Sequence, residues 1–106
     1  MDTEYATKVA ELNDEFRRSG FGVTITKGVQ ALENVPGLLA SVRSANYNQF
    51  TKDNDPYGEH DFGVIVWHGD KVYFKIDYFD QSLTYGEYPL SPKCKRVMTI
   101  MLASEY

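Results

Sequence analysis

Cysteine is almost absent from this chain of 106 residues, because Cys94 is the only one. A single cysteine cannot form an intrachain disulfide, which excludes the small secreted scaffolds that depend on several such bonds. The chain also lacks an apolar run long enough to cross a bilayer, and its first residues lack the pattern of a signal peptide. We therefore expect a cytoplasmic protein that does not associate with membranes.

Basic residues are scarce in the middle of the chain, where Lys71 and Lys75 are the only two between residues 53 and 87. The formal net charge is −4. Direct binding to DNA or RNA requires concentrated Lys and Arg, so we expect no direct contact with nucleic acid. An acidic surface of this kind suits a protein partner whose own surface is basic.

Apolar residues are sufficient for one core, since 42% of the chain is hydrophobic. This length suits one compact domain over residues 1–106 and is too short for two. Aromatic residues make up 14% of the chain, with eight Tyr and six Phe. Such side chains supply large contact areas in cores and interfaces, and we expect the tyrosines to serve one or both.

Apolar spacing predicts three helices. The first is capped by Asp2 or Thr3 and ends at Gly20, the second starts at Pro36 and ends near Asn46, and the third starts with Ser91-Pro92 and runs to Leu102. In the first helix the spacing of four, three and four residues defines the expected core face, which consists of Tyr5, Val9, Leu12 and Phe16.

Alternating residues predict a strand over residues 21–26 and a central hairpin over about 62–79. Gly69-Asp70 is the predicted two-residue turn, which sets Trp67 opposite Val72. A further short strand is considered near residues 83–85. The order α-β-α-β-β-(β)-α predicts an α+β fold with a mainly antiparallel sheet and helices on one face. The predicted core face of the hairpin carries Ile65, Trp67, Val72, Phe74, Ile76 and Tyr78.

The loop before the hairpin, residues 48–61, is the longest and among the most polar segments. Its carboxylates are hard oxygen ligands of the kind that Mg²⁺, Mn²⁺ and Ca²⁺ prefer, so Asp53, Asp55 and Glu59 form a candidate metal site. An EF-hand is excluded, because its twelfth position is Val64 where a bidentate Glu is needed. The alternative is that these side chains only form turns.

The predicted register also places His60 on the same face as Asp77, where a carboxylate could orient the imidazole for acid–base chemistry. No nucleophile motif accompanies this pair. Cys94 lies in the first turn of the predicted last helix beside basic residues, which would favour its thiolate. A structural His–Asp hydrogen bond and a cysteine without a role are the alternatives.

Five segments together resemble a bacterial family known only as domain of unknown function 3768. They are residues 12–17, 26–32, 50–63, 75–80 and 96–106, and the run from Asn54 to Gly63 is the most specific of them. The resemblance implies a short bacterial protein that is often associated with plasmids and other mobile DNA. It implies no activity.

The leading hypothesis is a non-enzymatic interaction protein from mobile DNA that binds a basic protein partner and needs no cofactor. Such a protein could inhibit a host or defence complex that handles nucleic acid, of the anti-CRISPR or anti-restriction kind. The residues predicted to bind the partner are Asp53, Asp55, Tyr57, Glu59 and Asp61.

Two alternatives remain open. One is a small hydrolase that uses a divalent metal on Asp53, Asp55 and Glu59, with His60 and Asp77 as the acid–base pair. The other is that the loop is purely architectural, with Asp55, His60 and Asp61 tying it to the sheet.

Overall fold

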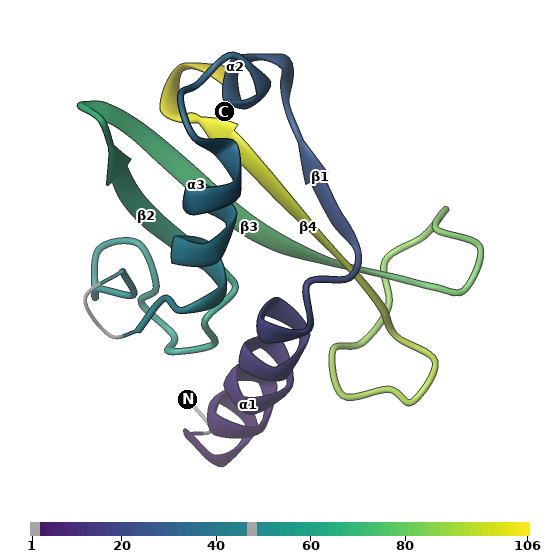
Figure 1. Cartoon of the computed structure of the whole chain (residues 1–106). Helices are drawn as coiled ribbons and strands as arrows, with labels where there is room; N and C mark the ends of the chain where they lie inside the picture. The colour runs from purple at the N-terminus through teal and green to yellow at the C-terminus, as the bar shows by residue number, and fades with distance from the viewer. Residues whose placement is uncertain (1–2, 47–48) are drawn as a thin grey trace.

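A computed structural model describes residues 3–46 and 49–106 of the chain. Four helical segments and four strands follow one another along it (Figure 1). In chain order they are α1 (Thr3–Ser19), β1 (Val23–Ile25), α2 (Lys27–Gln30), α3 (Val35–Arg43), β2 (Phe62–Trp67), β3 (Asp70–Phe79), β4 (Lys95–Leu102) and the 3₁₀ helix η1 (Ala103–Glu105).

The four strands form one sheet in the order β1-β4-β3-β2. β2 pairs with β3 and β3 pairs with β4 in antiparallel orientation, whereas β1 runs parallel to β4. The α+β class is therefore confirmed, but the sheet is mixed rather than mainly antiparallel. The parallel pair joins Val23 to Met98, two residues too far apart in the sequence for any local pattern to signal the contact.

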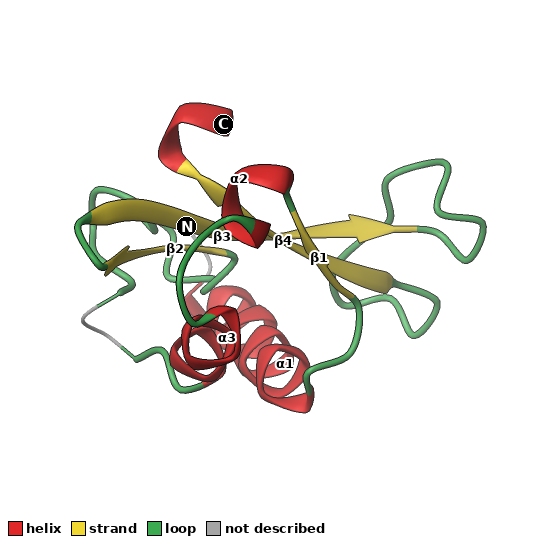
Figure 2. Cartoon of the chain, turned by 45° about the horizontal axis from the view of Figure 1, so that its top comes forward, coloured by secondary structure: helices red, strands yellow, loops and turns green. Residues whose placement is uncertain are grey.

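Two helices cover one side of the sheet. In Figure 2, α1 and α3 lie together on that side. α3 starts one residue earlier than predicted, at Val35, because the side chain of Asn34 caps it by accepting from the Gly37 N–H. The helices and the sheet enclose a core that includes Val29, Leu38, Val42, Val72, Phe74, Ile76, Met98 and Ile100.

The buried face of α1 differs from the predicted one. Leu12 is 40% exposed, whereas two polar side chains, Asn13 and Arg17, are almost completely buried. The helix is rotated toward these residues because both find hydrogen-bond partners in the interior. The buried residues of α1 are Ala6, Val9, Ala10, Asn13 and Arg17.

The helix predicted over residues 91–102 is wrong. Ser91 to Cys94 form a turn, closed by a hydrogen bond from the Cys94 N–H to the Ser91 carbonyl, and residues 95–102 form β4. β4 lies between β1 and β3, so pairing on both edges outweighs the local signals of Ser91 and Pro92. The predicted short strand near residues 83–85 is also wrong, since only Gly86 makes a bridge there. Residues 27–30, shortly after β1, form the short helix α2.

The central hairpin is confirmed, but its register is shifted by two residues from the predicted one. Trp67 pairs with Asp70 instead of Val72, and the turn residues are His68 and Gly69, both at positive φ. A shift of two residues leaves every side chain on its predicted face. Val72, Phe74 and Ile76 are accordingly buried in the core.

Candidate functional site

The loop before β2 is folded around the carboxylate of Asp55. Its oxygens accept hydrogen bonds from the backbone N–H groups of Glu59 at 3.0 Å and His60 at 3.2 Å, and the side chain is nearly buried. The Asp55 backbone also bonds to Thr51 and Gly58. Asp55 is thus a structural residue that fixes the path of the loop. Its carboxylate is engaged by the loop's own backbone.

His60 is held by α1 and not by the sheet. Its Nδ1 lies 3.0 Å from a carboxylate oxygen of Asp14, and its ring stacks on Phe50 with the centroids 4.5 Å apart. The predicted partner is wrong, since Asp77 pairs with Lys75 at 3.1 Å instead. The cause is the positive φ of His60, 57°, which turns the chain before β2 begins and breaks the strand alternation.

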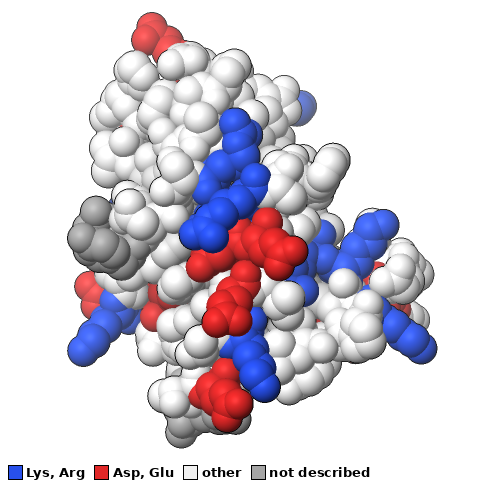
Figure 3. Space-filling view, turned by 60° about the horizontal axis from the view of Figure 1, so that its bottom comes forward, with Lys and Arg blue, Asp and Glu red and all other residues white. Residues whose placement is uncertain are grey.

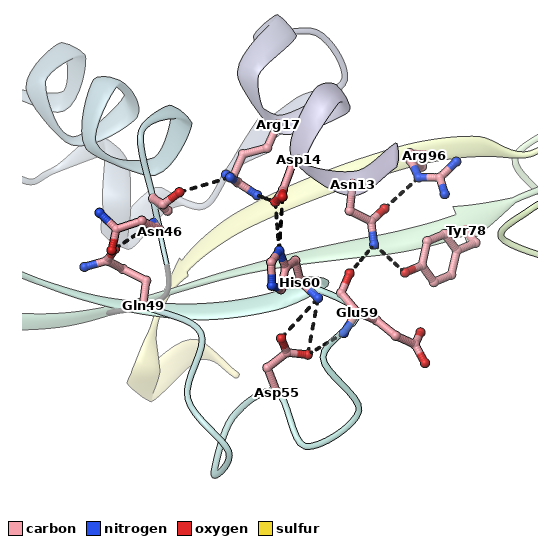
Figure 4. A network of polar contacts seen from close by, with 11 residues as sticks. Asn13, Asp14, Arg17, Asn46, Gln49, Asp55, Glu59, His60, Tyr78 and Arg96 are labelled. Atoms are coloured by element: carbon pink, nitrogen blue, oxygen red, sulfur yellow. Dashed lines mark hydrogen bonds and ion pairs between the residues drawn. The ribbon is translucent and has the colours of Figure 1, made fainter. Parts of the chain in front are cut away.

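Arg17 completes this contact between helix and loop. Its guanidinium donates to Asp14 at 2.8 Å and to the carbonyl of Ala45 at 3.1 Å, and it lies 5.1 Å from the centre of the Phe50 ring. Asp14 is therefore shared between Arg17 and His60 (Figure 4). The pair Asp14–His60 has the form of an oriented imidazole, but its surroundings are those of a packed structural contact.

A second polar centre, Asn13, joins four parts of the chain. Its side-chain amide donates to the Glu59 carbonyl at 2.9 Å and to the Tyr78 hydroxyl at 2.8 Å, and its oxygen accepts from Arg96 Nε at 2.7 Å. Asn13 is fully buried. α1, the loop, β3 and β4 thus meet at one amide (Figure 4). The feature of the sequence that could have revealed this centre is a pair of polar residues, Asn13 and Arg17, one helical turn apart in α1.

Next to Asn13, the carboxylates of Glu59 and Asp61 carry negative charge that no ion pair within the described residues neutralises. Partial burial raises the pKa of Glu59, and Asp61 and Asp55 raise it further. Burial also raises the pKa of Asp61, with Asp55 and Asp77 adding to the effect, while the Tyr78 hydroxyl opposes it. Among residues 3–46 and 49–106, no Lys or Arg forms an ion pair with Glu59 or Asp61.

Tyrosines flank these carboxylates. The rings of Tyr5 and Tyr88 stack with centroids 5.8 Å apart. Burial raises the pKa of Tyr5, and the charges of Glu59, Tyr88 and Asp61 raise it further. We call these four residues, Tyr5, Glu59, Asp61 and Tyr88, the tyrosine–carboxylate surface. Tyr57 is 58% exposed and lines a neighbouring hollow of about 430 Å³ against the start of α1.

The structure separates the predicted site residues into three groups. Glu59 and Asp61 lie together, and Asp55 lies beside them but is committed to the loop backbone. Asp53 instead lines a hollow on the opposite face of the sheet with Phe62. In the described part of the chain, no three His, Cys, Asp or Glu side chains are placed to hold a metal ion. The donor set predicted for a metal, Asp53, Asp55 and Glu59, is therefore not brought together.

Charge is mixed elsewhere on the surface. In the face shown in Figure 3, acidic and basic side chains alternate along the middle. That face offers no continuous acidic strip of the kind that would imitate a nucleic-acid backbone. Cys94 lies at a turn and not in a helix, so the predicted helix effect on its thiolate is wrong; burial raises its pKa, although Arg96 opposes the shift.

Residues 25–105 match the model of the family described as "Protein of unknown function (DUF3768)". The matched region starts in β1, so Asn13, Asp14 and Arg17 precede it. No curated protein and no solved structure matches the chain. In addition, none of the helices among the described residues is long and apolar enough to span a bilayer.

Proposed function

Because the chain belongs to the DUF3768 family of proteins of unknown function, its activity has to be inferred from the site, and we propose a non-enzymatic interaction protein. Its partner is a protein that presents Lys or Arg side chains to the tyrosine–carboxylate surface. A host or defence complex that handles nucleic acid is such a partner, since Lys and Arg line the channels that hold nucleic acid. Blocking that channel would suit a protein carried on mobile DNA.

The observation that carries this proposal is the uncompensated charge of Glu59 and Asp61. Burial raises the pKa of both carboxyl groups, the charge of Asp55 raises both further, and the charge of Asp61 adds to the shift of Glu59. A cation placed beside them would offset this repulsion and favour the ionised forms. Their arrangement therefore favours a basic group supplied from outside the chain.

The tyrosine pair fits the same ligand. A Lys or Arg side chain binds favourably over the face of an aromatic ring, and Tyr is among the residues that contribute most to protein interfaces. Tyr88 is 55% exposed. The tyrosine–carboxylate surface thus offers both kinds of contact that a guanidinium or ammonium group uses.

The support beneath the surface is rigid. The Glu59 carbonyl is held by Asn13, and the Glu59 N–H is held by Asp55. The Asp61 carbonyl accepts a ladder hydrogen bond from Ile76 at 2.8 Å. Since both ends of this segment are fixed before a partner arrives, little conformational entropy is lost on binding. The architectural role predicted for Asp55 and His60 is thus compatible with an interaction role for their neighbours.

Titration calorimetry with an oligo-arginine peptide tests the proposal. The double variant Glu59→Gln/Asp61→Asn should bind about tenfold more weakly, since partly exposed ion pairs contribute about 1 kcal/mol or less each. Glu11→Gln/Glu15→Gln is the matched control, because it removes the same charge from exposed positions on α1. Equal affinities for wild type and both double variants would reject the proposed surface.

The pH dependence gives a second readout. A bound cation lowers the pKa of both carboxyl groups, so binding releases protons wherever the free protein is protonated. The affinity should therefore rise as the pH rises through the raised pKa values. It should level off once both groups are ionised in the free protein. An affinity that falls with rising pH in the acidic range would contradict a carboxylate site.

A further inference from the structure

The face of the sheet opposite α1 and α3 is partly apolar, with Lys75, Asp77 and Thr99 among its side chains. The strand pairing sets Val64 beside Tyr73 and Tyr73 beside Met101 in one row across this face. The next row contains Phe62, Lys75 and Thr99. Val66, at the end of β2, is 69% exposed. Among residues 3–46 and 49–106, the helices other than α1 and α3 are the short segments α2 and η1, so no long helix covers this face.

Tyr106 forms a ridge across this open face. Its ring packs edge-on against both Phe62 and Tyr73, with the centroids 5.6 Å apart in each case, yet the residue remains 74% exposed. A hollow of about 520 Å³ lies on one side of the ring and one of about 290 Å³ on the other. Tyr106 lines both of them. The face thus carries a protruding aromatic ring directly beside spaces that could receive such a ring.

We propose that a second copy of this chain docks on this face about a two-fold axis. The Tyr106 ring of each copy then enters the larger hollow of the other, against Phe62, Val64 and Tyr73. A two-fold interface uses the same patch on both copies, so the patch has to be complementary to itself. A protruding ring next to a hollow meets this condition, because the two-fold rotation places the ring of each copy over the hollow of the other.

The charges of the larger hollow are also self-complementary. Asp53 and Lys71 are its only charged residues, one of each sign, and within the described chain neither forms an ion pair. In the proposed dimer, Lys71 of one copy pairs with Asp53 of the other. A strongly basic or acidic ligand would meet one like charge in the same hollow, so the charge pattern favours a second copy.

The size of the face sets the expected strength. Strands of ten residues or fewer at about 3.4 Å per residue, and four strands at about 4.8 Å spacing, give a flat area of at most about 650 Å². A standard interface buries about 800 Å² per partner. The dimer should therefore be weak, with a dissociation constant on the order of 10 to 100 µM.

Sedimentation velocity over a concentration series that brackets this range tests the proposal. Wild type should shift from monomer to dimer, and Tyr106→Ser should remain monomeric throughout. Tyr85→Ser is the matched control, because Tyr85 is similarly exposed at 72% but lies in the loop after β3. Far-UV circular dichroism at low concentration, where all three proteins are monomers, confirms that both variants remain folded.

A charge exchange gives an independent arm of the test. Lys71→Asp and Asp53→Lys should each weaken the dimer at least severalfold, and the double variant should restore it. Wild type that remains monomeric through the series would overturn the proposal and leave the face to a different partner. A dimer that Tyr106→Ser does not weaken would also overturn it. Neither outcome depends on the tyrosine–carboxylate surface, which lies elsewhere.

Discussion

Replacing Asn13 by alanine tests how the candidate surface is supported. The Asn13 side chain is fully buried and makes hydrogen bonds to Glu59, Tyr78 and Arg96. Asn13→Ala removes all three at once and leaves their partners without the buried amide. It also leaves a small void where α1 meets the sheet. No other single side chain in the described polar network connects as many separate parts of the fold.

The expected loss can be worked from these bonds. A neutral hydrogen bond contributes about 1 kcal/mol net, a bond to a charged group about 1.5–3 kcal/mol, and an orphaned buried partner adds to the cost. Two neutral bonds and one to the Arg96 guanidinium give a loss of about 3–5 kcal/mol. Domains of this kind have a total unfolding free energy of about 5–15 kcal/mol, so the variant should lose a large part of it.

Urea denaturation followed by circular dichroism measures this loss as a lower midpoint with an unchanged slope. Gln30→Ala is the control, because the exposed Gln30 amide makes a single bond of 3.2 Å to the Ile25 carbonyl. Its effect should stay within about 0.5 kcal/mol. A loss below about 1 kcal/mol for Asn13→Ala would refute the view that this amide holds the loop to the helix.

Three further predictions concern individual side chains. Folding raises the pKa of Asp61 above its ordinary value of 3.8, so ionisation of this group lowers the stability of the fold. Asp61→Asn should therefore raise the melting temperature at pH 7 and lose this advantage below pH 3.8. A variant with a lower melting temperature at pH 7 would contradict this sign. Leu83 has a φ of 59°, a left-handed conformation that costs a leucine about 1 kcal/mol or more, so Leu83→Asn should stabilise the fold by about 1 kcal/mol in the same urea assay; an unchanged or lower midpoint would count against the strain. Burial raises the pKa of Cys94, so iodoacetamide should alkylate it more slowly in the folded protein than in urea at the same pH; faster labelling when folded would show an activated thiolate instead.

The sequence predicted those features that depend on local patterns. The two faces of the hairpin were correct because alternation has a period of two, and the register error of two residues does not change it. The turn was misplaced because His68-Gly69 and Gly69-Asp70 are both acceptable pairs locally. On α1, the spacing of apolar residues predicted that Leu12 would be buried. The structure buries the polar residues Asn13 and Arg17 instead.

Other features depend on contacts between distant segments. β4 is a strand because β1 and β3 flank it, and its own sequence, with Ser91 and Pro92 before it, is equally acceptable as a helix. His60 finds Asp14 on α1 because a positive φ redirects the chain, which no alternation rule anticipates. The sequence treats the acidic segment as one unit, whereas the structure separates Asp55, which holds the loop, from Glu59 and Asp61, which remain uncompensated.

The most direct test of the central claim is an NMR titration of ¹⁵N-labelled protein with an oligo-arginine peptide, with oligo-glutamate as the control. If the tyrosine–carboxylate surface binds basic partners, oligo-arginine should shift the amide signals of Tyr5, Glu59, Asp61 and Tyr88 most strongly. Oligo-glutamate should leave those signals unchanged. Shifts spread over all exposed acidic residues, including Glu11 and Glu15 on the outer face of α1, would contradict a defined site and the function proposed for it.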